Sequence, residues 1–431
     1  MNSPSLSMES VLQNPDLLMA ILSVLLQSRP IVSSFYRTSV HLTLTQVCPL
    51  WRDLITKTPM FWTHIQFYCN KSDSELAVRQ NLLVEMWLER SKNLPFSLIL
   101  LEITRKNHTR PPYIPPQILQ HSHRFHYLHL NMSIPFLYNL LSSQEHPDSA
   151  FCFLKSITIT HSKRIRRSLN EEAPTFEFHQ FAGSLTAVTT IRMMMQGEMV
   201  FSWMLLFNPS RLTTLDLVPS PCVLDFPLSV EKALSVLRQC PGLQEARLLC
   251  IDGDSSLADN LAIIHKSLRT LALYEPSQGR PTVGHILENL TTPLLHSLSI
   301  TSMMEDLTLD AWRLDQFCSA WSMSRMMDFI SRLSAPLQEL RLKFPSKELD
   351  ISLIGDILAH NPFLLAFSCS SKFTTFSNIK VQGILDAIKC EGKTSMTPKS
   401  LYFWYNTKTQ VLTISSERLW RSEKLLETVI Y

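Results

Sequence analysis

Three hexads, Leu212–Leu217 (LTTLDL), Leu268–Leu273 (LRTLAL) and Leu337–Leu342 (LQELRL), place leucine at their first, fourth and sixth positions. The fourth and sixth residues of such a hexad point to one face of an extended chain, and the fifth points to the other. Looser apolar hexads with the same spacing begin at Phe125, Leu154, Val188, Leu243, Leu295 and Leu364. Successive hexads start 24 to 42 residues apart, near the leucine-rich-repeat period. The recurrence predicts short strands, each with one buried face.

Helix-like stretches separate several of these strands, at Leu228–Gln239, Val283–Leu290 and Ile351–His360. Strands that alternate with helices favour an α/β fold with a parallel sheet. We therefore expect an irregular leucine-rich-repeat solenoid over residues 96–431, and another kind of α/β domain is the alternative. The Asn or Cys usual three residues after the last leucine of a repeat is absent, so the repeats are degenerate.

In a solenoid, the residues between the hexad leucines line the face where partners bind. Those positions include Thr158, Glu245, Ser299 and Glu339, and their charges are of both signs. A mixed face suits a protein target better than a polyanion. The candidate target-binding residues are Tyr127, His129, Arg192, Asp216, Arg247 and Arg341.

The N-terminal 64 residues have a different, helical pattern. Pro15 and Asp16 suit the first turn of a helix whose apolar stripe contains Leu17, Leu18, Ile21, Leu22 and Leu25. A second stripe contains Leu44, Val47, Trp51, Leu54 and Ile55, and Pro49 divides it into two helices near Cys48. These patterns predict a disordered segment 1–12, a three-helix module 13–64 and a helical linker 65–95.

This module resembles the F-box, the helical module that docks onto the Skp-family adaptor of SCF-type ubiquitin ligases. The resemblance rests on Pro15–Leu22 (PDLLMAIL), Val47–Leu54 (VCPLWRDL) and Pro59–Trp62 (PMFW), and the usual leading Leu-Pro is Gln13-Asn14 here. It implies that the adaptor contacts Pro15, Leu18, Ile21, Leu22, Val47, Trp51, Leu54 and Trp62. Among these, Trp51 and Leu22 are the expected structural and docking anchors.

A second segment strengthens the resemblance. Trp87–Ser91 (WLERS) and Leu94–Leu98 (LPFSL) are similar to a segment that often follows the F-box in mushroom-forming fungi. Together the two segments imply a substrate receptor that recruits a protein target to a cullin ligase through the adaptor. A ligase-independent repeat scaffold and a generic helical cap on a larger domain are the alternatives.

Composition argues against most other classes. The net charge is +3, which gives no reason to expect a nucleic-acid partner. Only 9 glycines occur, and none forms a phosphate-binding loop. The nine cysteines contain no C-x-x-C pair, which favours reduced thiols in the cytosol or nucleus and no secretion. No catalytic signature, cofactor or transmembrane segment is expected.

Three further motifs receive ordinary interpretations. His121, His123, His126 and His129 are too poor in other ligands to predict a metal site. The basic run 163–167 is expected to be a solvated loop, and Met193–Met195 is expected to pack in the core.

Overall fold

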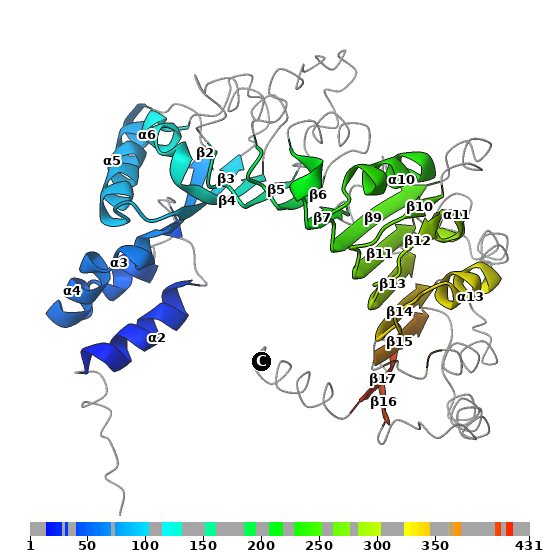
Figure 1. Cartoon of the computed structure of the whole chain (residues 1–431). Coiled ribbons are helices and arrows are strands. Elements are labelled where there is room, and N and C mark those ends of the chain that lie inside the picture. Colours follow the sequence, from blue (N-terminus) through cyan, green and yellow to red (C-terminus); the bar gives the residue numbers. More distant parts are fainter. Residues whose placement is uncertain are drawn as a thin grey trace, which may run out of the picture. The chain divides into compact units, whose positions relative to one another are not determined.

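The computed structural model has a mixed α/β fold with a large parallel sheet, which confirms the expected class (Figure 1). The structure describes residues 14–27, 31–32, 40–69, 74–102, 114–131, 151–160, 185–194, 207–218, 228–251, 262–275, 283–302, 323–344, 361, 364, 366–371, 401–406 and 411–416. The chain forms two compact units. Unit 1 comprises residues 1–195 and 199–208, and unit 2 comprises residues 196–198 and 209–431.

The described helices of unit 1 are α2 (Pro15–Gln27), α3 (Val40–Leu44), α4 (Pro49–Lys57), the 3-10 helix η1 (Pro59–Trp62), α5 (Ser74–Arg90), α6 (Pro116–Gln120) and the 3-10 helix η2 (Ser122–Arg124). Four of them, α2, α4, η1 and α6, begin at a proline. Cys48 lies in extended conformation as the N-cap of α4, so Pro49 separates α3 from α4 as predicted. The Asn14 side chain accepts hydrogen bonds from the amides of Asp16 (3.0 Å) and Leu17 (3.3 Å), and therefore caps α2.

The expected helical linker over residues 65–95 is wrong at its start, because His64–Cys69 forms strand β2. Its side chains alternate between half-buried and buried, and this period of two fits a strand and not a helix. Among the described residues of this range, only α5 is helical. The helical module and the first strands thus belong to one compact unit, and the expected boundaries at 64 and 96 do not divide the structure.

The sheet of unit 1 is parallel, with strands in sequence order. Its strands are β1 (Ile31–Val32), β2, β3 (Phe96–Glu102), β4 (Phe125–Asn131), β5 (Ser156–Thr160) and β6 (Thr190–Met194). Register aligns the hexad leucines into buried rows. One row is Ile65, Leu98, Leu128, Ile157 and Ile191, and the next is Phe67, Leu100, Leu130, Ile159 and Met193. Each side chain buried this way contributes roughly 1.5–3 kcal/mol.

Unit 2 continues the same pattern. Its parallel strands are β7 (Thr214–Leu217), β9 (Glu245–Ile251), β11 (Thr270–Glu275), β13 (Ser297–Ser302), β14 (Glu339–Phe344) and β15 (Ala366–Ser371). Short pairs join β8 (Leu228–Ser229) to β9 and β10 (Ile263–Ile264) to β12 (Leu290–Thr291), and the 3-10 helix η5 (Pro209–Arg211) precedes β7. From Leu154 onward, each strand begins two residues after the first residue of its hexad, so the predicted hexads locate these strands.

The last described strands depart from the predicted parallel array. β17 (Val411–Ser416) pairs antiparallel with β15, and β16 (Leu401–Asn406) pairs antiparallel with β17. Only four residues separate β16 from β17 in the sequence, and a parallel pair would need a crossover of a dozen residues or more. The short connection therefore dictates the antiparallel pairing.

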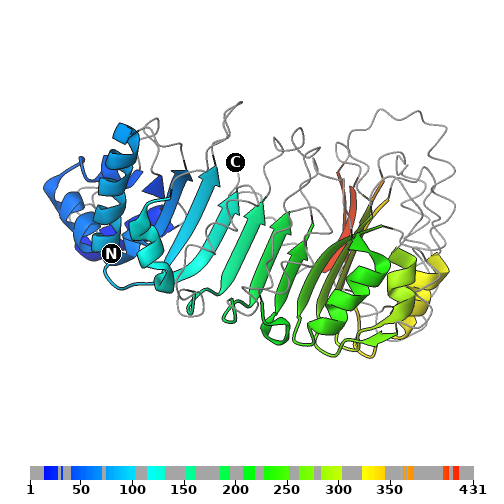
Figure 2. The ribbon, with the colours of Figure 1, turned by 90° about the horizontal axis from the view of Figure 1, so that it is seen from above.

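Three helices lie on one face of the unit 2 sheet, as Figures 1 and 2 show: α10 (Val230–Gln239), α11 (Val283–Asn289) and α13 (Met323–Ser331). The first two confirm the helices expected near 228–239 and 283–290, and the stretch 351–360 lies outside the described residues. Ser229 caps α10 by accepting a hydrogen bond from the amide of Lys232 (3.3 Å).

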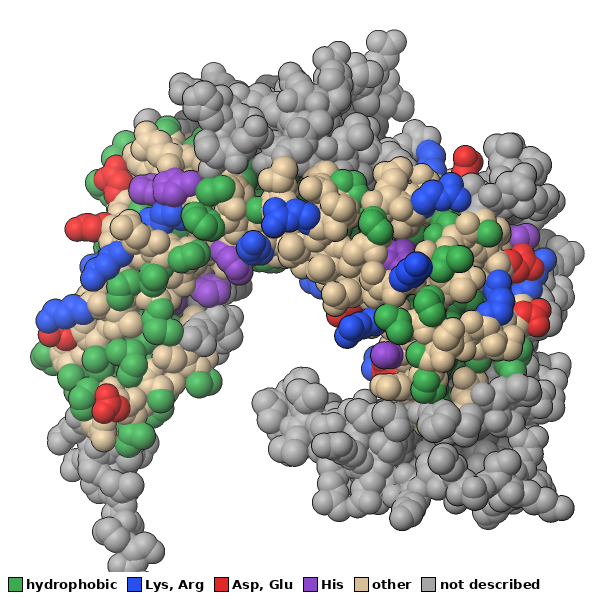
Figure 3. Space-filling view, viewed as in Figure 1, with side chains coloured by type: hydrophobic (Ala, Val, Ile, Leu, Met, Phe, Trp, Pro, Cys, Tyr) green, Lys and Arg blue, Asp and Glu red, His purple; other side chains and the backbone are tan. Residues whose placement is uncertain are grey.

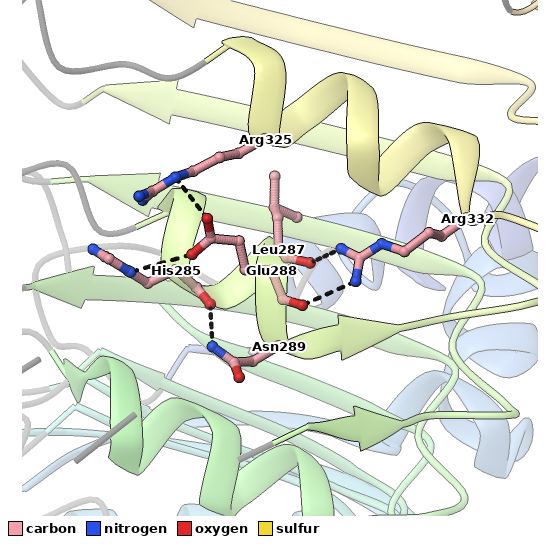
Figure 4. A network of polar contacts seen from close by, with 6 residues as sticks. All are labelled: His285, Leu287, Glu288, Asn289, Arg325 and Arg332. Carbon is pink, nitrogen blue, oxygen red and sulfur yellow. Dashed lines mark hydrogen bonds and ion pairs between the residues drawn. The ribbon is translucent and has the colours of Figure 1, made fainter. Parts of the chain in front are cut away.

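Polar contacts fasten α13 to α11 (Figure 4). Arg325 pairs with Glu288 (Nε–Oε1 2.7 Å), and the Arg332 guanidinium donates to the carbonyls of Leu287 (2.6 Å) and Glu288 (2.9 Å). Those carbonyls lie at the C-terminal end of α11, where a cation is favourable. A Cβ on Gly284 would lie 3.1 Å from Arg325 Cδ, so glycine leaves room for this side chain to cross α11.

Candidate functional site

Helix α2 has two apolar stripes, and only one is buried. Leu18, Leu22 and Leu26 lie at i, i+4 and i+8 and are almost fully buried. The other stripe remains in contact with solvent, with fractional exposures of 42% for Leu17, 40% for Ile21, 76% for Val24 and 41% for Leu25. The sequence pattern suggested one wide stripe. The structure divides it into a core-facing half and an outward-facing half.

Further apolar side chains are exposed on the neighbouring helical segments. They are Val47 before α4, Leu50 on α4 and Met60 on η1. Figure 3 shows hydrophobic side chains gathered over α2 to α4. We call these seven residues, Leu17, Ile21, Val24, Leu25, Val47, Leu50 and Met60, the helical apolar surface. Contiguous exposed apolar surface on a soluble protein commonly marks an interaction site.

The eight expected adaptor-binding residues divide between this surface and the core. Ile21 and Val47 belong to the helical apolar surface, Pro15 is exposed, and Trp51 and Leu54 are half-buried. Leu18, Leu22 and Trp62 are buried in the module itself. Sequence reasoning missed the exposure of Val24, Leu50 and Met60. The only available signal was that seven leucine, isoleucine and valine residues on α2 are too many for one packed face.

Trp62, and not Trp51, is the buried anchor of the module. The indole Nε1 of Trp62 donates to the carbonyl of Ile55 (2.8 Å), and the Arg90 guanidinium lies 4.4 Å from the centre of its ring. A buried indole N–H requires such a partner, and a cation over the ring adds an attractive contact. These contacts tie η1 both to α4 and to the end of α5.

His41 lies against the same ring, with 6.0 Å between ring centres, and is buried. Burial lowers the pKa of His41 to about 4, although a hydrogen bond with the backbone of Phe61 opposes the shift and nearby His64 adds to it. The imidazole is therefore neutral at pH 7, and its protonation would place a charge inside the module.

The WLERS and LPFSL segments meet at one buried arginine. Arg124 donates to the Ser91 hydroxyl (2.7 Å) and to the Leu94 carbonyl from both Nε (3.1 Å) and Nη2 (2.9 Å), and it lies 5.1 Å from the Phe96 ring centre. Burial lowers the pKa of the Arg124 guanidinium, but this group remains charged at any ordinary pH. In this chain the two segments join α5, β3 and η2, and so serve the fold of unit 1.

The outward face of the unit 1 sheet contains three of the expected target-binding residues: Tyr127, His129 and Arg192. Register places Gln66, Ile99, His129, Thr158 and Arg192 at one level of this face. Tyr127 donates to Thr158 Oγ1 (3.2 Å), and His129 Nε2 lies 3.3 Å from Thr160 Oγ1. Burial, with a smaller effect of nearby Arg192, lowers the pKa of His129. The result is a polar face of rings and hydroxyls.

The outward face of the unit 2 sheet contains the other three: Asp216, Arg247 and Arg341. Asp216 and Arg247 are direct neighbours in register, with 3.8 Å between Oδ2 and Nη1. Arg341 pairs with Glu339 on its own strand (Nε–Oε1 2.7 Å). The structure thus gathers the expected residues onto a sheet face within each unit.

The histidines and cysteines of the described residues do not gather into a metal site. Nowhere in the described ranges is a group of three His, Cys, Asp or Glu side chains placed to hold a metal ion. The rings of His121 and His123 lie 6.0 Å apart, while His126 is exposed and His129 faces Thr160. Cys48, Cys69, Cys152, Cys240 and Cys250 form no disulfide in the described part of the chain. The basic run 163–167 lies outside the described residues, and Met193 is buried as expected.

Comparison of the sequence with models of known protein families gives no match, and comparison with curated proteins gives none either. Within the described part of the chain, no helix combines the length and apolar character needed to cross a bilayer. The function must therefore be argued from the two kinds of surface described above.

Proposed function

We propose that this chain is a substrate-receptor subunit of an SCF-type ubiquitin ligase. The helical module over residues 13–64 would act as an F-box and dock the Skp-family adaptor. The parallel sheet would act as an irregular leucine-rich-repeat solenoid and bind a protein target. The observation that carries the proposal is the exposed second stripe of α2 in a module whose other stripe already forms a core.

The helical apolar surface has the character of a docking site. Val24 is 76% exposed although valine favours burial, and it lies one turn from Ile21 and beside Leu25. Burying an apolar side chain against a partner contributes roughly 1.5–3 kcal/mol, so a few of these residues suffice for measurable affinity. The absent Leu-Pro at positions 13–14 leaves the helix start intact, because Asn14 caps α2.

The sheet supports the second half of the proposal. Parallel strands in sequence order, with aligned rows of buried leucines, are the arrangement of a repeat array in which each repeat packs on its neighbours. The opposite face of each unit carries polar and charged side chains suited to a protein surface. On this reading, the chain performs no chemistry and acts in the cytosol or nucleus. It raises the effective concentration of the target near the ubiquitin-loaded enzyme.

The test is co-purification of the full chain with the Skp-family adaptor from the same organism. An Ile21→Asp/Leu25→Asp variant places two carboxylates on the exposed stripe and should abolish binding. A Val78→Asp/Leu82→Asp variant is the matched control, because these residues are also exposed, apolar and four apart on α5. Circular dichroism would verify that both variants are folded.

Loss of adaptor with the α2 variant and retention with the α5 variant would support the receptor function. If the folded wild-type chain does not bind the adaptor, the receptor function is wrong, and a ligase-independent interaction scaffold is favoured. Equal losses in the two variants would mean that the helical apolar surface is not the docking site.

A further inference from the structure

On the outward face of the unit 2 sheet, β11 and β13 carry small side chains at two successive levels, and we call this band, two strands wide, the trough. At these two levels its floor consists of small side chains, Thr270 and Ala272 on β11 and Ser297 and Ser299 on β13, and Tyr274 of β11 occupies the next level. Long charged side chains rise on the flanking strands, Glu245 and Arg247 on β9 and Glu339 and Arg341 on β14. No described helix covers this face, because α10, α11 and α13 lie on the other one (Figure 1).

The two walls match each other level by level. Glu245 is in register with Thr270, Ser297 and Glu339, and one level farther along the strands Arg247 is in register with Ala272, Ser299 and Arg341. The walls are three strand spacings apart, about 14 Å, and the two levels are about 7 Å apart. One level therefore has glutamates on both flanking strands, and the next has arginines on both, of which Arg247 pairs with Asp216 on β7 and Arg341 pairs with Glu339 on its own strand.

The guanidinium groups are the more accessible members of their ion pairs. The side chain of Arg247 is 50% exposed and that of Asp216 10%, while Arg341 is 60% exposed and Glu339 30%. Ser297 also donates to Glu339 Oε2 (2.7 Å), which holds this carboxylate at the edge of the floor. Ion pairs so near water are weak, and a ligand can compete for the arginines.

We infer that this trough binds an extended protein segment with oppositely charged side chains at positions i and i+2. In an extended chain these side chains point the same way and are about 7 Å apart, which equals the separation of the two levels. A lysine or arginine of the segment lies between Glu245 and Glu339, and an aspartate or glutamate lies between Arg247 and Arg341. The inference rests on the proposed function, for which it specifies the target sequence.

The order of the two charges in the segment is free, because the segment can run in either direction along the strands. A uniform charge is not tolerated, since one level would then face like charges. The same argument rejects a nucleic-acid backbone, whose every phosphate is negative.

The experiment uses four fluorescein-labelled heptapeptides that share a Ser-Thr frame and differ in the central triplet: Lys-Thr-Asp, Asp-Thr-Lys, Lys-Thr-Lys and Asp-Thr-Asp. Anisotropy titrations with the full chain, up to millimolar concentration, give their relative affinities. The two mixed peptides should bind about tenfold more tightly than the two uniform ones, since each like-charged contact replaces a weak ion pair.

Charge-reversal variants make the test independent of folding. An Arg247→Glu/Arg341→Glu chain has four carboxylates and should prefer the Lys-Thr-Lys peptide, and a Glu245→Lys/Glu339→Lys chain should prefer Asp-Thr-Asp. Unfolding cannot create these gains of binding. An unchanged ranking in both variants, or no preference for the mixed peptides by the wild-type chain, would overturn the inference.

The two proposals fail separately. Adaptor co-purification depends on α2, so the Arg247→Glu/Arg341→Glu chain should still retrieve the adaptor. If the peptide ranking holds while the adaptor does not bind, the trough stands and the ligase function falls. If the adaptor binds and the ranking fails, the target is recognised elsewhere.

Discussion

Replacing Trp62 by alanine should open the helical module of unit 1, whereas the same change at Trp51 should not. Trp62 is fully buried, donates a 2.8 Å hydrogen bond to Ile55 and lies under the Arg90 guanidinium. Removing a buried tryptophan side chain costs about 3–5 kcal/mol. Trp51 is half-buried, and no hydrogen bond of its indole is described, so its loss should cost about 1–2 kcal/mol.

Hydrogen exchange measured by mass spectrometry is the appropriate assay, because it gives the exchange rate of each peptide separately. The stability of unit 2 therefore does not mask a change in unit 1. A loss of about 3–5 kcal/mol should accelerate exchange in peptides covering residues 15–27 and 49–62 by about 10²- to 10⁴-fold. A Trp62→Phe variant keeps an aromatic ring but loses the N–H and one ring of the indole, and should cost about 1–2 kcal/mol. If Trp51→Ala accelerates exchange as much as Trp62→Ala, the assignment of the anchor to Trp62 is wrong.

The remaining predictions concern other buried groups. The pKa of His41 is about 4 in the folded chain and 6.5 in the unfolded chain. Between pH 4 and 6.5 the unfolded chain therefore binds more protons than the folded chain. The free energy of unfolding should fall by about 3 kcal/mol as the pH drops from 6.5 to 4. In thermal melts, His41→Gln should remove most of this slope. Arg124→Met should destabilise unit 1 by about 3 kcal/mol in urea titrations, because three hydrogen bonds are lost, while exposed Arg238→Met should cost under about 0.5 kcal/mol. Glu288→Ala should loosen α13 by under about 1 kcal/mol, since its pair with Arg325 is half-exposed, and exchange in 323–331 should quicken modestly.

The consequence for function is that stability and docking can be separated in this chain. Leu18, Leu22 and Trp62 are buried in the helical module, and a substitution there would disturb the proposed docking site indirectly by unfolding. Ile21 and Leu25 are exposed on the same helix, so a substitution there changes the surface alone. Experiments on the proposed docking site should therefore use the second pair.

Much of the backbone follows from local sequence. The hexad spacing determines where most parallel strands begin, since apolar residues two apart must share one face of a strand. Pro15 and Pro49 determine where two helices start, because proline lacks the N–H that a helix interior needs and fits the first turn. The outward positions of Arg247 and Arg341 follow from the same alternation.

Tertiary structure decides what these local rules leave open. The apolar residues on α2 do not reveal which of them pack inward, because packing against η1 places Leu18 and Leu22 in the core and leaves Ile21 and Leu25 exposed. Likewise, Arg124 is an ordinary charged residue in the sequence. In the structure it is buried against Ser91 and Leu94, which lie 33 and 30 positions earlier in the chain. The matched levels of the trough also arise from register across four strands. A periodic pattern specifies which residues share a face, but it contains no information on which elements will cover that face.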